Sequence, residues 1–161
     1  MTDKAQAARV LAACRRRGFM VATAESCTGG LVAGALTAVP GSSDVVDRGF
    51  VTYSNAAKEA MLGVPREVLE RHGAVSAETA AAMAEGALAR SDADLAVAVT
   101  GIAGPGGGTA EKPAGLVHFG GAARDGRRVH RECRFGDIGR AAVRARSVAE
   151  ALAILEALAA E

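Results

Sequence analysis

Residues 19–34, FMVATAESCTGGLVAG, change from one structural pattern to another within a few positions. The apolar run over residues 19–24 has the length and continuity of a strand that is buried on both faces, as in a parallel sheet. Gly29 then opens a helical pattern whose apolar side chains include Leu31 and Leu36. A strand that passes through a sharp turn into a helix is the repeating unit of α/β folds, so this stretch predicts the fold class.

The rest of the chain repeats these signals. Continuous or β-branched apolar runs predict strands at 49–54 and 94–100, and a hairpin formed by 116–122 and 127–135. Amphipathic spacing predicts helices at 3–17, 56–62, 65–72 and 77–90, and a last helix with Val148, Ala151, Leu152 and Leu155 on one face. Asn55 and Ser76 are the expected N-caps of the third and fifth helices. We therefore expect a single domain over residues 1–161, a three-layer α/β/α sandwich with a mixed, largely parallel sheet.

Composition narrows the classes of function. The chain of 161 residues is 50% hydrophobic but only 3% aromatic, so its core must consist of Ala, Val, Leu and Met. Few aromatic surfaces remain for base stacking, which argues against a single-stranded nucleic-acid partner. The net charge of +1 implies no polyanionic partner. Eight arginines do fall within residues 124–146; either they form a solvated surface, or one or two of them reach an anionic ligand.

The cysteines, the N-terminus and the hydropathy indicate a compartment. Cys14, Cys27 and Cys133 are widely spaced and have no zinc-like partners, which favours reduced thiols in a cytoplasmic protein and no metal. The N-terminus has no signal-peptide pattern. No apolar run reaches the length that crosses a bilayer, so no membrane association is expected.

Three predicted strands run into polar or glycine-rich turns. Residues 19–24 lead to Ser26, 49–54 lead to Tyr53, Ser54 and Asn55, and 94–99 lead to Thr100 and Gly101. If the strands are parallel, these turns share one edge of the sheet, and ligands of open α/β sheets bind at that edge. The sequence therefore predicts a site there.

The turn after residue 24 offers two nucleophiles. Free amides of Gly29 and Gly30 at the start of the helix could stabilise an oxyanion beside the Ser26 hydroxyl. Alternatively, Ser26 or Thr28 only caps this helix. Cys27 is the rival nucleophile, because a thiol near a helix N-terminus has a lowered pKa; its other interpretation is a small buried core residue.

A serine nucleophile needs a base. His72, His118 and His130 follow no strand end, so we interpret them as structural. Lys58 lies in the first turn of its helix, where the helix dipole favours the neutral amine, but only burial could lower its pKa by the roughly three units that a base near pH 7 requires. Otherwise Lys58 is a surface lysine. Tyr53, the only tyrosine, could orient Lys58 or simply pack.

The glycine-rich stretch 101–115 lacks the Lys-Ser/Thr ending of a P-loop and has no GxGxxG in the required place. A long loop of this kind in a compact domain is usually functional or disordered. Its backbone amides can approach a ligand closely. Lys112 either adds charge to that ligand or is solvated.

Seven motifs occur in an order that is typical of a known family. They are AESCTGG (24–30), PGSS (40–43), VTYSNAAK (51–58), LGV (62–64), GAVS (73–76), TGIAGPGGG (100–108) and KPAGLV (112–117). Together they closely resemble the C-terminal domain of the CinA family, the nicotinamide mononucleotide deamidases or PncC-type amidohydrolases. The resemblance covers residues 5–158.

The resemblance implies hydrolysis of the nicotinamide carboxamide to nicotinate mononucleotide and ammonia, without metal or cofactor. By matching motif, Ser26 is the expected nucleophile and Lys58 the base, with Tyr53 beside it. The remaining residues expected to bind substrate are Thr28, Gly29, Gly30, Thr100, Gly101, Gly104 and Arg140. The expected partner is a small-molecule nucleotide, and the expected assembly is a homo-oligomer, most simply a dimer.

The sequence departs from the family near its C-terminus. The family pattern is Gly-Asp-Arg, two residues, an apolar residue and Arg; Arg140, Val143 and Arg144 keep this spacing, but Gly139 stands where Asp is expected. By this spacing Arg140 is the expected contact to a substrate phosphate or carboxylate. The alternative function is a nucleotide-binding or regulatory module without turnover.

Overall fold

The computed structural model describes residues 4–160. The helices are α1 (Lys4–Arg17), α2 (Leu31–Thr37), α3 (Asn55–Leu62), α4 (Arg66–His72), α5 (Ala77–Ala89) and α6 (Arg140–Ala160), with a 3₁₀ turn at Ser42–Asp44. The strands are β1 (Val21–Glu25), β2 (Val46–Val51), β3 (Leu95–Gly101), β4 (Leu116–Ala123) and β5 (Arg128–Arg134).

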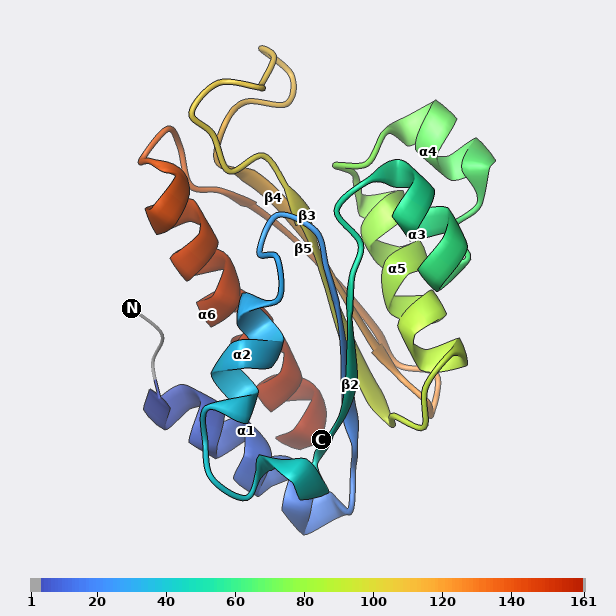
Figure 1. Ribbon diagram of the computed structural model, residues 1–161, viewed down its shortest axis with the longest axis vertical. Helices are drawn as coiled ribbons and strands as arrows, with labels where there is room; N and C mark the ends of the chain where they lie inside the picture. Colours follow the sequence, from blue (N-terminus) through green and yellow to red (C-terminus); the bar gives the residue numbers. More distant parts are fainter. Residues whose placement is uncertain (1–3, 161) are drawn as a thin grey trace.

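The strands form one mixed sheet with the order β2-β1-β3-β4-β5. Strands β2, β1 and β3 are parallel, whereas β4 is antiparallel to both β3 and β5. Helices α1, α2 and α6 cover one face and α3, α4 and α5 cover the other, which makes the three layers of an α/β/α sandwich (Figure 1). The predicted fold class is confirmed, and the three parallel strands bring their carboxyl ends to one edge.

The two faces of the sheet differ in side-chain size. The face under α5 carries small residues, Ala22, Ala24, Ala96 and Ala98, whereas the face under α1 and α6 carries larger ones that include Val97 and Phe119. Small side chains let α5 lie close to the strands: a Cβ built on Gly120 would be 2.5 Å from the carbonyl oxygen of Ala80. The core therefore closes without many aromatic residues, as the composition requires.

Two local expectations are wrong. The second strand is Val46–Val51 rather than 49–54, so Tyr53 lies beyond the strand, and the amide of Thr52 makes a last hydrogen bond to the carbonyl oxygen of Glu25 in β1 at 2.8 Å. The N-cap of α3 is Ser54 rather than Asn55, because the Ser54 hydroxyl accepts a hydrogen bond from the Ala57 amide at 3.0 Å, and Asn55 is already helical. Either residue type can cap a helix, and the two are adjacent, so propensity could not separate them.

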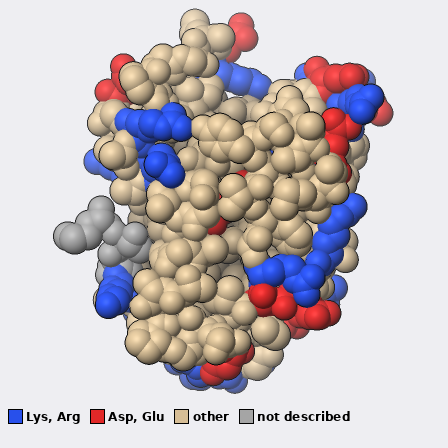
Figure 2. All heavy atoms as spheres, in the orientation of Figure 1, with Lys and Arg blue, Asp and Glu red and all other residues tan. Residues whose placement is uncertain are grey.

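The edge strand β2 lies toward the viewer in Figure 1 and Figure 2, and residues other than Lys, Arg, Asp and Glu cover most of the centre of that face. Leu31, Val51, Tyr53 and Met61 are exposed large apolar side chains of β2 or of the segments beside it. The homo-oligomer stays a prediction. Across residues 4–160, no helix combines the length and apolar character that a membrane span requires.

Candidate active site

A cavity of about 330 Å³ lies at the carboxyl edge of the parallel strands. Its walls include Ser26 after β1, Tyr53 after β2, Thr100 at the end of β3, and the loop that follows β3. Lys58 of α3 and Arg140 of α6 complete it from the two helical layers. The three strand ends that the sequence singled out therefore meet, together with one residue from each helical layer.

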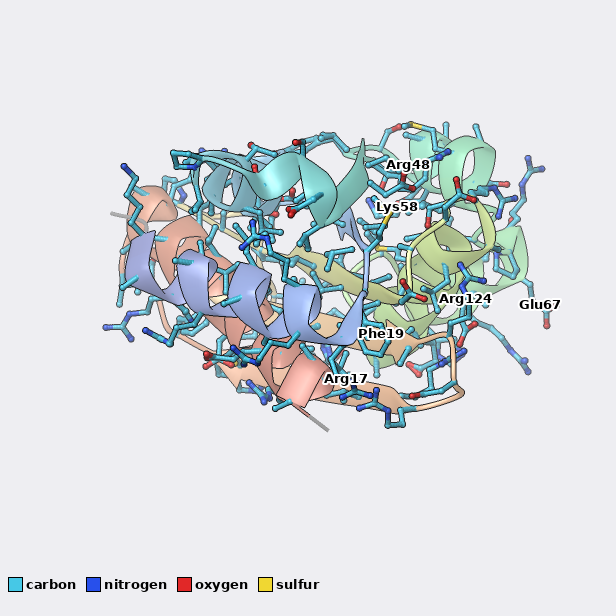
Figure 3. The ribbon with its side chains drawn as sticks, turned by 90° about the horizontal axis from the view of Figure 1, so that it is seen from below. Arg17, Phe19, Arg48, Lys58, Glu67 and Arg124 are labelled. Carbon is cyan, nitrogen blue, oxygen red and sulfur yellow. The ribbon has the colours of Figure 1, made fainter. Side chains whose placement is uncertain are left out.

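Ser26 and Lys58 are in direct contact inside this cavity. The Nζ of Lys58 is 2.9 Å from the Oγ of Ser26, although 32 positions separate the two residues. Lys58 is only 1% exposed and Ser26 is 8% exposed. Figure 3 shows Lys58 within the molecule rather than on its surface. Burial removes the interpretation of Lys58 as a solvated surface lysine.

The other contacts of Lys58 decide which protonation state can react. Its Nζ also donates to the carbonyl oxygens of Thr52 and Tyr53, at 2.8 and 3.2 Å. Burial lowers the pKa of Lys58 from 10.5 to about 8. A neutral amine has two N–H groups and one lone pair, and the two carbonyls can only accept. In the neutral state the lone pair therefore faces the Ser26 hydroxyl, which is the arrangement of a general base.

Tyr53 contacts Lys58 through its backbone and not through its hydroxyl. The Tyr53 side chain is 61% exposed, and its hydroxyl oxygen accepts a hydrogen bond from Nη2 of Arg140 at 2.8 Å. Nη1 of Arg140 donates to the carbonyl oxygen of Gly104 at 3.0 Å. Arg140 thus joins α6, the loop after β3 and the segment after β2 at the cavity, with its guanidinium available to an anion.

Thr100, Gly101 and Gly104 all line the cavity. The hydroxyl of Thr100 donates to the carbonyl oxygen of Ala74 at 2.8 Å, so toward the cavity its oxygen can only accept. At Gly101 a Cβ would lie 2.8 Å from the carbonyl oxygen of Leu116, so a larger residue would push β4 away.

Thr28, Gly29 and Gly30 are not among the residues that line the cavity. The amide of Gly29 donates to the carbonyl oxygen of Ser26 at 3.0 Å and closes the turn, so it is not free for an oxyanion. Thr28 is fully buried. Within residues 4–160 the backbone amides of Cys27, Thr28 and Gly30 donate to no other residue, and of these three only Cys27 lines the cavity.

Two residues that hold the turn were missed by sequence reasoning. The buried carboxylate of Glu25 accepts from the amides of Val32 and Ala33 at 2.9 and 3.0 Å, and so caps α2. Arg144 of α6 donates to the carbonyl oxygens of Cys27 and Thr28. The spacing between Glu25 and Val32 does not match a capping box, so no sequence signal pointed to Glu25. For Arg144, its spacing from Arg140 was a signal that could have been used.

The histidines lie away from the cavity. Nδ1 of His118 is 3.0 Å from Nε2 of His130, and His72 lies 3.6 Å from Glu78; none of the three lines the cavity. No group of three or more His, Cys, Asp or Glu side chains within residues 4–160 is arranged to hold a metal ion.

Cys27 is expected to be inert toward thiol reagents. It is 5% exposed, and burial raises its pKa to about 11, so only about one thiol in a thousand is ionised at pH 8. Iodoacetamide at pH 8, followed by mass spectrometry, should alkylate the partly exposed Cys133 well before Cys27. Both should react alike after denaturation. Rapid alkylation of native Cys27 would restore it as the rival nucleophile.

The chain is similar to proteins of one family over nearly its whole length. The model of the CinA C-terminal domain matches residues 3–159. A CinA-like protein of Parasynechococcus marenigrum (strain WH8102) is 55% identical over 152 residues, which are 94% of this chain but only 36% of that protein. A nicotinamide-nucleotide amidohydrolase PncC of Enterobacter agglomerans is 58% identical over 116 residues, which are 72% of this chain and 71% of that protein.

Solved structures agree with this assignment. The crystal structure of competence/damage inducible protein CihA from Agrobacterium tumefaciens superposes with a TM-score of 0.96 at 58% identity and covers 98% of both chains. A competence damage-inducible protein A from Klebsiella pneumoniae gives a TM-score of 0.92 at 39% identity. Because fold, family model and ordered motifs coincide, the chain belongs to the CinA C-terminal domain family.

Proposed function

We propose that this protein is an amidohydrolase that converts nicotinamide mononucleotide to nicotinate mononucleotide and ammonia, with Ser26 as nucleophile and Lys58 as base. The observation that carries the proposal is the 2.9 Å contact between the buried Lys58 amine and the Ser26 hydroxyl inside the cavity. The similarity to a protein named nicotinamide-nucleotide amidohydrolase supports the reaction class.

The contacts of Lys58 give a sequence of proton transfers. The neutral amine takes the proton of the Ser26 hydroxyl while Oγ attacks the carboxamide carbon, which forms a tetrahedral intermediate. The resulting ammonium is held by the carbonyls of Thr52 and Tyr53 and returns its proton to the departing nitrogen, so ammonia leaves and an ester to Ser26 remains. Water then attacks this ester with Lys58 as base, which releases the carboxylic acid and restores Ser26.

Different residues of the cavity wall are assigned to different parts of the substrate. The amide of Cys27, which lines the cavity and donates to no other residue within 4–160, is the donor that we assign to the oxyanion. Arg140, fixed by Tyr53 and Gly104, supplies a guanidinium to the phosphate of the nucleotide. Gly101 and the rest of the loop at 101–107 offer backbone groups at close approach. The reaction needs no cofactor in this scheme.

The test is to incubate the protein with nicotinamide mononucleotide and to measure ammonia and the acid product in equal amounts. We expect the two products to be released in equal amounts. Added hydroxylamine should convert part of the product to the hydroxamate, because hydroxylamine and water compete for the Ser26 ester. Saturable binding of the nucleotide with no ammonia would instead identify a regulatory binding module.

A further inference from the structure

Arg144 reaches from α6 to the turn that carries Ser26. Its Nε donates to the carbonyl oxygen of Cys27 at 3.1 Å, and its Nη2 lies 3.4 Å from the carbonyl oxygen of Thr28. A Cβ added to Gly29 would lie 3.3 Å from the same Nη2. One guanidinium therefore contacts two successive peptide groups directly after the candidate nucleophile.

These contacts fix the orientation of both peptide groups. In a trans peptide the N–H points opposite to the C=O. The peptide between Thr28 and Gly29 is held at both ends, since its carbonyl accepts from Arg144 and its N–H donates to the carbonyl of Ser26. The peptide between Cys27 and Thr28 has its carbonyl on Arg144, so the free Thr28 amide must point away from α6.

The position of Arg144 on α6 separates its task from that of Arg140. The two residues are four positions apart and so lie on the same side of the helix. Arg140 lines the cavity and contacts Tyr53 and Gly104, whereas Arg144 is not among the lining residues and its hydrogen bonds within residues 4–160 go to the turn. In the first turns of α6, Arg140 thus faces the cavity that would hold the substrate, and Arg144 holds the turn that carries Ser26.

We propose that Arg144 is a positioning residue, which sets the Ser26 hydroxyl against Lys58 by holding the two peptide groups of the turn that follow it, without touching the substrate. The proposal rests on the proposed Ser26–Lys58 chemistry. A planar guanidinium bridges two carbonyls with two nitrogens, whereas a lysine ammonium is a single point donor that reaches one of them well. Substitution should therefore lower the rate of the chemical step and leave substrate affinity almost unchanged.

The experiment compares Arg144→Gln, Arg144→Lys and the control Arg146→Gln, since Arg146 is an exposed arginine of the same helix. Two rates are measured: turnover of nicotinamide mononucleotide, separated into kcat and KM, and covalent modification of Ser26 by a fluorophosphonate probe, followed by mass spectrometry. The second rate reports the reactivity of the nucleophile and needs no natural substrate.

We expect Arg144→Gln to slow both kcat and probe modification by about 100-fold, because an error of about 1 Å in the reacting geometry costs that much. Arg144→Lys should fall between it and the unaltered protein, with an unchanged melting temperature, and Arg146→Gln should match the unaltered protein.

If Arg144→Gln does not fold, Arg144→Lys carries the test alone. A folded Arg144 variant with unchanged kcat and unchanged probe modification overturns the proposal, as does an effect confined to KM. If the unaltered protein reacts with the probe but releases no ammonia, the proposed function fails while the role of Arg144 is still read from the probe.

Discussion

Replacement of Ser26 by alanine is expected to reduce amide hydrolysis by at least about 10⁴-fold, because removal of a nucleophile that acts as a unit with its base eliminates the covalent route. The hydroxyl is 2.9 Å from the Lys58 amine and lies in the cavity wall, and no other residue of that wall presents a hydroxyl to this amine. The measurement is ammonia release at saturating nicotinamide mononucleotide, with the hydroxamate partition lost in parallel.

Cys27→Ala is the matched control for that variant. Cys27 is adjacent to Ser26 and also lines the cavity, but its raised pKa and its burial keep it as a thiol. The variant should retain most of the activity and all of the reactivity of Ser26 toward the fluorophosphonate. An active Ser26→Ala protein beside an inactive Cys27→Ala protein would transfer the nucleophile to the thiol.

Lys58→Met is expected to lower the rate by about 10³-fold, the range of general acid–base catalysis, and to change how the rate depends on pH. The folded-state pKa of Lys58 is about 8, and only the neutral amine can accept the Ser26 proton. The rate should therefore rise about tenfold for each pH unit below about 8 and level off above it. The residual rate of Lys58→Met should lack this ionisation.

Stability provides an independent check on the same residue. The pKa of Lys58 is lowered from 10.5 to about 8 on folding, so between these values the unfolded chain binds more protons than the folded one. The free energy of unfolding of the unaltered protein, relative to Lys58→Met, should accordingly rise with pH across that window and stay constant below it. Urea titrations of both proteins at pH 7 and pH 9.5 measure this difference. A constant difference, or a rate profile that Lys58→Met preserves, would remove Lys58 from the mechanism.

The sequence predicted the layers of the fold because its signals were local. The apolar runs at 94–100 and 19–24, and the Ser76 cap of α5, depend on neighbours within a few residues, and all three are found. The end of β2 was predicted too late in the sequence. Residues 52–54 continue the β-branched and aromatic character of the strand, but the pairing of β2 with β1 ends at Val51. Propensity describes a segment, whereas pairing with the neighbouring strand decides where it ends.

The candidate site divides in the same way. Ser26 and Lys58 were predicted as site residues from a turn, from helix position and from resemblance, but the burial that lowers the pKa of Lys58 is a tertiary property that no local pattern contains. Gly29 was expected to donate to an oxyanion, and its amide instead closes the turn on Ser26. Arg144 acts across 117 positions of sequence, so only the packing of α6 reveals its contact with Cys27.

Gly139, which stands where relatives are expected to carry aspartate, has a φ of 99° and supplies the carbonyl that begins the hydrogen bonding of α6. An L-amino acid with a side chain is strained by about 1–3 kcal/mol in such a conformation. The backbone at position 139 therefore has a conformation that favours glycine over aspartate. An aspartate at position 139 would therefore lower the stability of the domain unless the loop before α6 took another backbone conformation.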